Sequence, residues 1–337
     1  MAARPTIVIV GPTAGGKSAL AVALAEKWGG QVIGADSMQI YRHMDAGTAK
    51  PTAEQQARVR HHLIDIVEPT EQFTVADWLK RATDKIDHLQ RQSITPIVVG
   101  GTNLYIQTLL EGMFEGPPAD ANFRASLADV PPSELHQRLA DTDPQAAQQI
   151  HPNDRKRLIR ALEVYELTGR PISQWQTQWV GAAGYSTSPT NARHSADYST
   201  DRFQIIALDW PVEAINQRIN LRVKAMFYPH KVEPTIADQV VPKRESLIDE
   251  VKRLTEGQLL GPQAIQALGY KQVTEYLKGS TTIEQAFEQT KILTRRFAKT
   301  QRTWLRRFRH LNNLEAAGKS TTVLADDAAS IITTLIN

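Results

Sequence analysis

The segment GPTAGGKS at residues 11–18 constrains the fold more than any other part of the chain. It fits the pattern G-x-x-x-x-G-K-[ST] in full, and it lies between a β-branched run at residues 6–10 and strong helix formers at residues 19–27. In this context the loop N–H groups and the positive end of the following helix converge on phosphate oxygens. The alternative is an ordinary glycine-rich turn between a strand and a helix. The candidate phosphate-binding residues are Gly11, Pro12, Thr13, Ala14, Gly15, Gly16, Lys17 and Ser18.

The first hundred residues alternate between strand and helix patterns. Further strands are predicted at residues 31–35 and 96–99, with a helix at residues 76–92. Such alternation is typical of a parallel sheet covered by helices. Residues 103–202 show helical periodicity and no strand pattern, and a strand returns at residues 205–208. The predicted fold class is therefore α/β, with a P-loop NTPase-like parallel sheet core, a helical inserted domain and a helical C-terminal region.

These pattern changes also predict the domain boundaries. Residues 1–115 and 203–315 are assigned to the α/β core, residues 116–202 to the insertion, and residues 316–337 to a C-terminal tail segment. Within the insertion, residues 181–201 are small and polar, which predicts a mobile loop.

Composition excludes several classes of protein. The chain has no cysteine, which excludes disulfides, thiolate nucleophiles and cysteine-based zinc sites. Its apolar runs are too short to span a bilayer, and the N-terminus does not read as a signal peptide. We therefore expect a soluble cytoplasmic protein that makes no contact with a membrane.

The positive charge is concentrated near the C-terminus. Eight of the 39 basic residues lie within residues 291–310, which contain no acidic residue. This concentration favours a polyanionic partner. Leu293, Phe297, Trp304 and Phe308 recur there near helical spacing, and we expect these apolar side chains to belong to the core.

Polar residues follow the predicted strands at the edge where a ligand should bind. Asp36 comes directly after the second strand, and Thr102 follows the third. Because ligands of open α/β sheets lie beyond the carboxyl ends of the strands, Asp36 should face the bound phosphate compound as a base or a metal-associated carboxylate. The alternatives are a turn or cap role for Asp36, and a cap role for Thr102 at the next helix.

Asp209 favours a different chemistry. It ends the hydrophobic strand at residues 205–208, as does the Mg²⁺-holding aspartate of many P-loop NTPases. This reading predicts an ATP-binding kinase or ATPase. The alternative is a strand-terminal aspartate that holds no metal.

Six segments, taken together, resemble one family. They are GPTAGGKS (11–18), ADSMQIYRHMDAGTAKP (35–51), VVGGTNLY (98–105), HPNDRKRLIRALEV (151–164), ALGYKQ (267–272) and TRRFAKTQRTWLRR (294–307). They occur in the order seen in the tRNA dimethylallyltransferases of bacteria and span nearly the whole chain. Residues 227–244 depart from the family pattern, but contain none of the catalytic candidates.

The resemblance implies a reaction and its participants. A dimethylallyl group passes from dimethylallyl diphosphate to the exocyclic amine of the adenosine 3′ to the anticodon, giving isopentenyladenosine and diphosphate. The expected partners are the tRNA anticodon stem-loop and the prenyl donor, the expected cofactor is Mg²⁺ at Ser18, and the expected state is a monomer. The alternatives are a P-loop nucleotide kinase, an adenylate isopentenyltransferase that acts on free nucleotide, and a non-enzymatic RNA-binding protein.

The resemblance also implies roles for individual residues. Asp36 would take the amine proton, and Thr102 would hydrogen-bond the bridging oxygen of the donor. Lys17, Arg218 and Arg222 would neutralise the leaving diphosphate, with the division between the two arginines left open. A solvated helix face is the alternative for the arginine pair. The tRNA-contacting residues would be Asp36, Ser37, Met38, Gln39, Thr102, Arg124, Lys156, Arg157, Leu158, Ile159 and Arg160.

Overall fold

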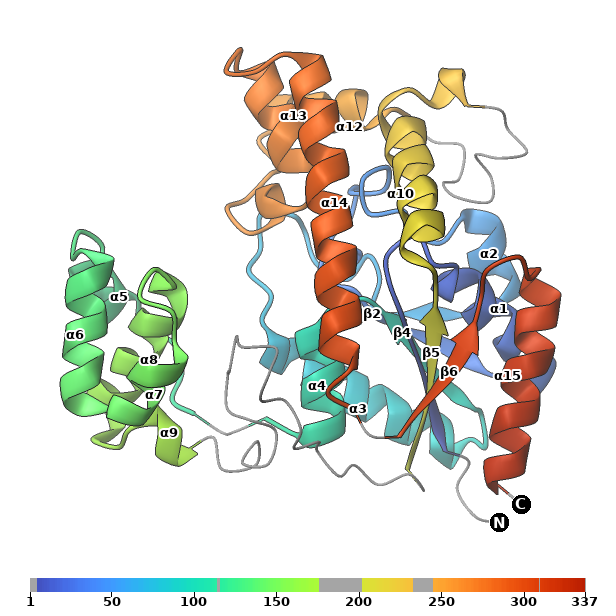
Figure 1. The fold of residues 1–337 in the computed structure, drawn as a ribbon, viewed down its shortest axis with the longest axis horizontal. Coiled ribbons are helices and arrows are strands. Elements are labelled where there is room, and N and C mark those ends of the chain that lie inside the picture. The colour runs from blue at the N-terminus through green and yellow to red at the C-terminus, as the bar shows by residue number, and fades with distance from the viewer. Residues whose placement is uncertain (1–4, 114–115, 176–201, 233–244, 309, 337) are drawn as a thin grey trace. The chain divides into compact units, whose positions relative to one another are not determined.

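The computed structural model describes residues 5–113, 116–175, 202–232, 245–308 and 310–336, and Figure 1 shows the fold. These residues form two compact units. The core unit comprises residues 1–107, 199–306 and 310–337, and the helical unit comprises residues 108–198 and 307–309. The first boundary between them falls within helix α4, after residue 107, which is eight residues before the predicted boundary at residue 115.

A six-stranded parallel sheet forms the centre of the core unit. The strands lie in the order β3-β2-β4-β1-β5-β6, so β1 lies between β4 and β5. Their bounds are β1 (Thr6–Val10), β2 (Gln31–Ala35), β3 (His61–His62), β4 (Pro96–Gly100), β5 (Phe203–Asp209) and β6 (Leu311–Glu315). β1 and β4 are buried throughout, as expected of parallel strands covered on both faces.

Helices connect and cover these strands. In the core unit they are α1 (Lys17–Trp28), α2 (Ala53–Arg58), α3 (Val75–Arg91), α10 (Val212–Phe227), α12 (Leu247–Glu256), α13 (Tyr270–Leu277), α14 (Ile283–Leu305) and α15 (Thr321–Ile336), with 3-10 turns η2 (Pro229–Lys231) and η3 (Ala264–Gln266). α14 begins at a capping box, in which the Thr282 hydroxyl accepts from the Gln285 N–H and the Gln285 side chain accepts from the Thr282 N–H. No helix within the described ranges is long and apolar enough to cross a membrane.

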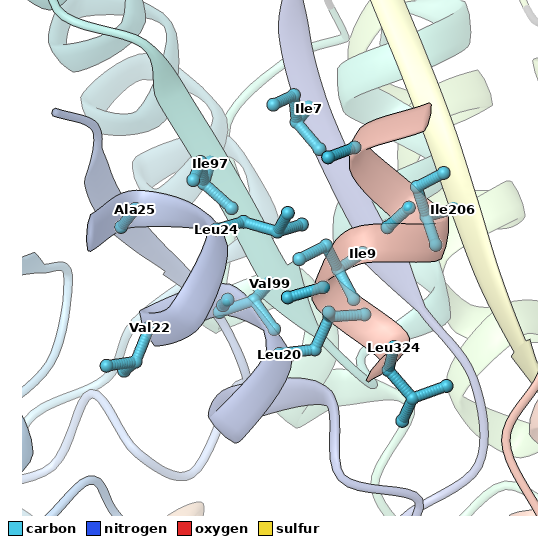
Figure 2. Packing of buried hydrophobic residues seen from close by; sticks show 14 of the residues in the cluster. Ile7, Ile9, Leu20, Val22, Leu24, Ala25, Ile97, Val99, Ile206 and Leu324 are labelled. Atoms are coloured by element: carbon cyan, nitrogen blue, oxygen red, sulfur yellow. The ribbon is translucent and has the colours of Figure 1, made fainter. Parts of the chain in front are cut away.

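One face of the sheet packs against α1 and α15. Figure 2 shows Ile7, Ile9 and Ile206 from the strands between Leu20 of α1 and Leu324 of α15. Both helices contribute completely or almost completely buried side chains to this cluster. The C-terminal helix therefore completes the core of the sheet.

The prediction of a separate C-terminal tail at residues 316–337 is therefore wrong. Ala316 is completely buried at the end of β6, and α15 packs along α1. The sequence analysis also missed β6, because its residues LNNLE carry no β-branched side chain and no hydrophobic alternation. Its neighbour β5 supplies the pairing that makes this polar segment a strand.

The helical unit has its own apolar core. It contains the C-terminal end of α4 (Asn103–Glu111), then α5 (Ala121–Ser126), α6 (Pro132–Thr142), α7 (Pro144–Gln149), α8 (Arg155–Thr168) and α9 (Ile172–Trp175). Leu135 and Leu139 of α6 pack with Leu158 and Val164 of α8. Within the described residues this unit contains no strand, as the sequence predicted. The predicted mobile loop at residues 181–201 lies outside the described residues.

Stability measurements can test the contribution of α15 to the core. Leu324 is 5% exposed, whereas the preceding Val323 is 45% exposed. Leu324→Ala should lower the free energy of unfolding of the core unit by about 2–5 kcal/mol, because it removes buried methyl groups and leaves a cavity. Val323→Ala should change it by less than about 0.5 kcal/mol. Urea unfolding followed by circular dichroism compares the two variants. An equal effect of the two substitutions would show that α15 is not part of the core.

Candidate active site

The phosphate loop connects β1 to α1 as the sequence predicted. Gly16 adopts the left-handed region at φ 88° and occupies the N-cap position of α1. Thr13, Ala14, Gly15, Gly16, Lys17 and Ser18 line a polar cavity of about 150 Å³. Gly11 and Pro12 do not line it; their carbonyl oxygens accept hydrogen bonds from the Lys17 ammonium, at 3.0 Å and 2.8 Å. The loop thus contributes one lysine and two hydroxyl residues, Thr13 and Ser18, to the lining of the cavity.

Four lysine and arginine side chains of the core unit line this polar cavity, and one of them, Lys50, is already paired with Asp45 and Asp65. Lys17 comes from the phosphate loop, and Arg218 and Arg222 lie one turn apart on α10. Asp36 is the single acidic residue among the lining residues. The alternative that the arginines form a solvated helix face is wrong, since both are partly buried and line the cavity.

The electrostatics of the cavity favour a bound anion. Burial and the nearby charge of Arg222 lower the pKa of Lys17 to about 8, although Asp36 opposes this shift. Burial likewise lowers the pKa of Arg222 to about 10, again opposed by Asp36. Cations that are destabilised by burial and by one another gain most from an anion placed between them.

The two arginines make different contacts. The Arg218 Nε donates to the Ala14 carbonyl at 2.8 Å, and its guanidinium lies 4.8 Å from the centre of the Trp210 ring. Trp210 in turn donates from its ring nitrogen to the Gly15 carbonyl at 3.0 Å. Arg222 instead donates to the Thr48 carbonyl at 3.4 Å, a long bond that leaves most of its donors available. Arg218 therefore supports the loop, and Arg222 is better placed to bind a ligand.

Asp36 lies where the polar cavity adjoins a second, apolar one. The second cavity measures about 290 Å³, and Met38, Val223, Met226, Leu268 and Leu293 provide its apolar lining. Both cavities are lined by Thr13, Asp36, Arg222 and Phe297. The Asp36 Oδ1 accepts from the N–H groups of Met38 at 2.9 Å and Gln39 at 3.3 Å. Asp36 therefore holds a turn, which confirms the turn reading, and it also lines both cavities. Its role as a base or a metal-associated carboxylate stays a prediction.

Thr102 lines the apolar cavity beside Asp36. Its hydroxyl accepts from the Ser37 N–H at 2.9 Å and donates to the Ser37 hydroxyl at 3.3 Å. Its N–H donates to the Ala35 carbonyl at 3.1 Å. The hydroxyl thus joins the ends of β2 and β4. Parallel pairing of β2 with β4 brings Asp36 and Thr102 together from positions 66 residues apart.

Asp209 lines neither cavity, although it ends β5 as predicted. Its side chain is exposed, and its Oδ1 accepts from the N–H of the next residue, Trp210. The reading of Asp209 as the Mg²⁺ carboxylate of an NTPase therefore finds no support in the structure. Among the described residues there is also no group of three or more His, Cys, Asp or Glu side chains that could hold a metal ion.

Two residues of α14 that line the cavities escaped the sequence analysis. Phe297 was expected in the core, but it is 39% exposed and lines both cavities, so that expectation is wrong for this residue. Phe297 thus borders the two cavities instead of packing into the core. Gln301 lines the polar cavity and is almost completely buried. No feature of the sequence other than its position in the segment 294–307 marked it out.

In the helical unit, two of the predicted RNA-contacting arginines share one buried carboxylate. Arg124 binds Glu163 through two hydrogen bonds of 2.7 Å and 2.8 Å, and Arg160 binds the same carboxylate at 2.6 Å. The Asp120 N–H also donates to it, at 2.8 Å. Burial alone raises the pKa of Glu163, but the bonds from Arg124, Arg160 and Asp120 outweigh it and lower the pKa to about 2. Glu163 is therefore an anion that orients two half-exposed guanidinium groups.

The other residues predicted on α8 divide into exposed and buried ones. Lys156 and Arg157 are exposed, and Arg157 also pairs with Asp154 at 3.3 Å. Leu158 is completely buried in the core of the helical unit, so its prediction as an RNA-contacting side chain is wrong. Ile159 is partly buried against the same cluster. The helical period explains the division, because positions 158 and 162 face the core while positions 156 and 157 face away.

Comparisons with known proteins show the family of this chain. The family profile "IPP transferase" matches residues 39–308. A "tRNA dimethylallyltransferase 1" of Citrifermentans bemidjiense is 41% identical over 321 residues, which covers 94% of each chain. A "tRNA dimethylallyltransferase" of Geobacter sulfurreducens is 42% identical over 308 residues, covering 89% of this chain and 88% of the relative.

Two solved structures share the fold over nearly the whole chain. The full-length tRNA isopentenylpyrophosphate transferase of Bacillus halodurans superposes with a TM-score of 0.66 at 34% identity, covering 99% of this chain and 97% of that one. A eukaryotic dimethylallyltransferase acting on tRNA superposes with a TM-score of 0.75 at 25% identity, covering 99% of this chain and 79% of that one.

The pKa of Lys17 predicts how anion binding depends on pH. With a pKa of about 8, Lys17 is charged below about pH 7 and loses its proton above about pH 9. A bound anion raises this pKa, so affinity for inorganic pyrophosphate should be full below about pH 7 and fall as pH rises through 8. Calorimetry at about pH 8, in buffers of different ionisation enthalpy, should detect proton uptake on binding. Lys17→Arg should remove the part of the proton uptake that comes from Lys17. The proton exchange of pyrophosphate itself is the same for both proteins. Equal uptake by both proteins would contradict the assignment.

The Glu163 ion triad predicts a pH-dependent stability of the helical unit. Because the pKa of Glu163 is lowered in the folded state, its contribution is present above the unfolded pKa of 4.5 and is lost as pH falls towards 2. Glu163→Gln should lower the free energy of opening of α8 at neutral pH by about 2 kcal/mol, as measured by hydrogen exchange. This difference should shrink at about pH 3. Glu166→Gln, an exposed carboxylate on the same helix, is the matched control and should have little effect.

Proposed function

The chain belongs to the IPP transferase family, and from this premise we propose that it is a tRNA dimethylallyltransferase. It transfers a dimethylallyl group from dimethylallyl diphosphate to the exocyclic amine of the adenosine 3′-adjacent to the anticodon. The single observation that carries this proposal is the position of Asp36. This carboxylate lies between a cationic cavity that suits a diphosphate and an apolar cavity that suits a prenyl group and a base.

The donor would bind with its diphosphate on the phosphate loop. The loop amides, Lys17 and Arg222 would neutralise the negative charge as the bond between C1 of the dimethylallyl group and the diphosphate oxygen breaks. Arg218 would hold the loop through Ala14. Thr102 would turn its hydroxyl hydrogen from the Ser37 hydroxyl to the bridging oxygen, while the hydroxyl oxygen keeps the bond it accepts from the Ser37 N–H.

The acceptor adenine would enter the apolar cavity beside Asp36 and Thr102. Its amine nitrogen forms the new bond to C1, the diphosphate leaves with the electron pair of the broken bond, and the Asp36 carboxylate accepts the amine proton. The amine becomes acidic only as the new bond forms, so an ordinary carboxylate suffices as the base. The base must first leave the anticodon-loop stack, as in other enzymes that modify a base.

Mg²⁺ is the proposed cofactor. The Ser18 hydroxyl lines the polar cavity, and a small cation with one protein ligand would take its other ligands from the diphosphate and water, as Mg²⁺ commonly does. When bound, the ion would neutralise charge on the leaving diphosphate.

The helical unit supplies the proposed grip on the anticodon stem-loop. Arg124, Lys156, Arg157 and Arg160 present cationic groups, and contacts from such groups to phosphates would give affinity without sequence preference. We also propose that the protein acts as a monomer. A tRNA substrate supports the proposal that the protein acts in the cytoplasm.

Prenyl transfer to tRNA can be measured directly. The purified protein is incubated with dimethylallyl diphosphate, Mg²⁺ and unmodified tRNA that carries adenosine next to the anticodon, and nucleoside masses are determined. We expect one dimethylallyl group on that adenosine. Transfer to free AMP alone would instead indicate an adenylate isopentenyltransferase, and ATP consumption without prenyl transfer would indicate a kinase or ATPase.

Substitution of Asp36 tests its role as the base. Asp36→Asn should lower the rate of transfer by at least about 100-fold, because a general base contributes on this order, while binding of the donor persists. Asp209→Asn is the matched control, since this carboxylate ends the neighbouring part of the sheet but lines neither cavity. Near-normal turnover of the Asp36 variant would remove Asp36 as the base.

A further inference from the structure

We infer that Gln301 of α14 is a positioning residue for prenyl transfer. It holds the phosphate loop in a fixed position relative to the loop that contains Gly101 and Thr102 (the Thr102 loop). This inference rests on the proposed function. It concerns a residue for which the mechanism above has no chemical role, since Gln301 neither carries charge nor exchanges a proton.

The amide of Gln301 makes one hydrogen bond to each loop. Its Oε1 accepts from the Thr13 N–H at 2.7 Å, and its Nε2 donates to the Gly101 carbonyl at 2.9 Å. The side chain is 1% exposed, so water cannot replace either bond without opening the site. An amide is the neutral side chain that offers an acceptor and a donor side by side, which is what these two loops require.

The two loops have different roles in the proposed reaction. Thr13 lies in the loop that would hold the diphosphate, and Gly101 immediately precedes Thr102, which contacts the reacting end. β1 and β4 are adjacent strands, but their pairing ends with Ile9 opposite Val99, before either loop. Beyond that point Gln301 is a bridge between the loops. A displacement of about 1 Å between leaving group and Thr102 would cost about 100-fold in rate.

Packing around Gly101 shows that this contact is closely fitted. A Cβ atom at position 101 would lie 2.2 Å from the Gln301 Nε2, a distance that real atoms do not tolerate. The absence of a side chain at residue 101 therefore lets the amide reach the backbone. The same Cβ position would lie 3.8 Å from the Lys17 Nζ. The bridge therefore lies beside the cation that would bind the diphosphate.

A second glutamine provides a matched control. Gln263 also bridges backbone groups, accepting from the Phe73 N–H at 3.1 Å and donating to the Phe73 carbonyl at 2.8 Å. It lines neither cavity. Gln263→Ala therefore removes a similar pair of bonds at a residue that lines neither cavity, and reports what such a loss does to stability.

The experiment compares Gln301→Ala, Gln301→Glu and Gln263→Ala in the full chain. Single-turnover transfer to tRNA, the KM for each substrate, the affinity for inorganic pyrophosphate and the thermal unfolding temperature are measured. Gln301→Ala should lower the single-turnover rate by about 10- to 100-fold, with a smaller change in either KM. Gln301→Glu keeps the bond from Thr13 and loses the one to Gly101, and its rate should fall between wild type and Gln301→Ala. Gln263→Ala should lower the unfolding temperature but leave the transfer rate unchanged.

Two results would overturn the inference. One is a Gln301→Ala rate within about twofold of wild type; the other is an equal loss of rate in both alanine variants, which would show a general effect of stability. If Gln301→Ala does not fold, Gln301→Glu decides, because a wild-type rate in that variant excludes a role for the Gly101 bond. If the wild type itself transfers no prenyl group, the proposed function fails. Pyrophosphate binding then decides on Gln301: weaker binding in Gln301→Ala than in Gln263→Ala supports its role in holding the loop, and equal binding overturns it.

Discussion

The candidate active site depends on the parallel pairing of β2, β4 and β1 as neighbouring strands. Because the strands run in one direction, the phosphate loop, Asp36 and Thr102 all emerge at the same edge of the sheet. An antiparallel arrangement of the same strands would place alternate loops at opposite edges. The packing of α1 and α15 on one face of the sheet keeps this edge in place (Figure 2).

Around this edge, the helices that follow β5 supply the charge and the walls of the cavities. α10 brings Arg218 and Arg222 to the phosphate loop, and α14 brings Phe297 and Gln301. Each arginine is held by a backbone carbonyl of a loop distant in sequence. The result is a set of cations that is held in place before any anion arrives, at the cost of a lowered pKa for Lys17 and Arg222.

The helical unit holds several cationic side chains close together on a small surface. Glu163 does so for Arg124 and Arg160, since one buried carboxylate accepts bonds from both. The pair keeps a net positive charge, and both guanidinium groups retain exposure to solvent. Leu158 and its neighbours on α8 fill the apolar core beneath, so one helix serves both surface and core.

Much of the fold was predictable from the sequence because it follows from local patterns. Strands β1, β2, β4 and β5, helices α1 and α3, and the phosphate loop all carry periodicity or motif residues that neighbours along the chain determine. β6 and α15 were not recognised as parts of the core, because a polar strand becomes a strand only through its partner β5. Within the site, Asp36 and Thr102 were predictable as residues at strand ends. The position of Asp209 outside both cavities was not, since the sequence alone does not say which strand ends border a cavity.

The sequence by itself thus determined which residues can bind phosphate and which strand ends carry polar groups. Only the tertiary structure decided that Gln301 joins two loops, that Phe297 lines both cavities, and that Glu163 binds two arginines. The physical reason is the range of the interactions involved. Backbone conformation and helical or strand periodicity are set over a few residues, whereas a hydrogen bond from residue 301 to residue 13 exists only once the helices have packed.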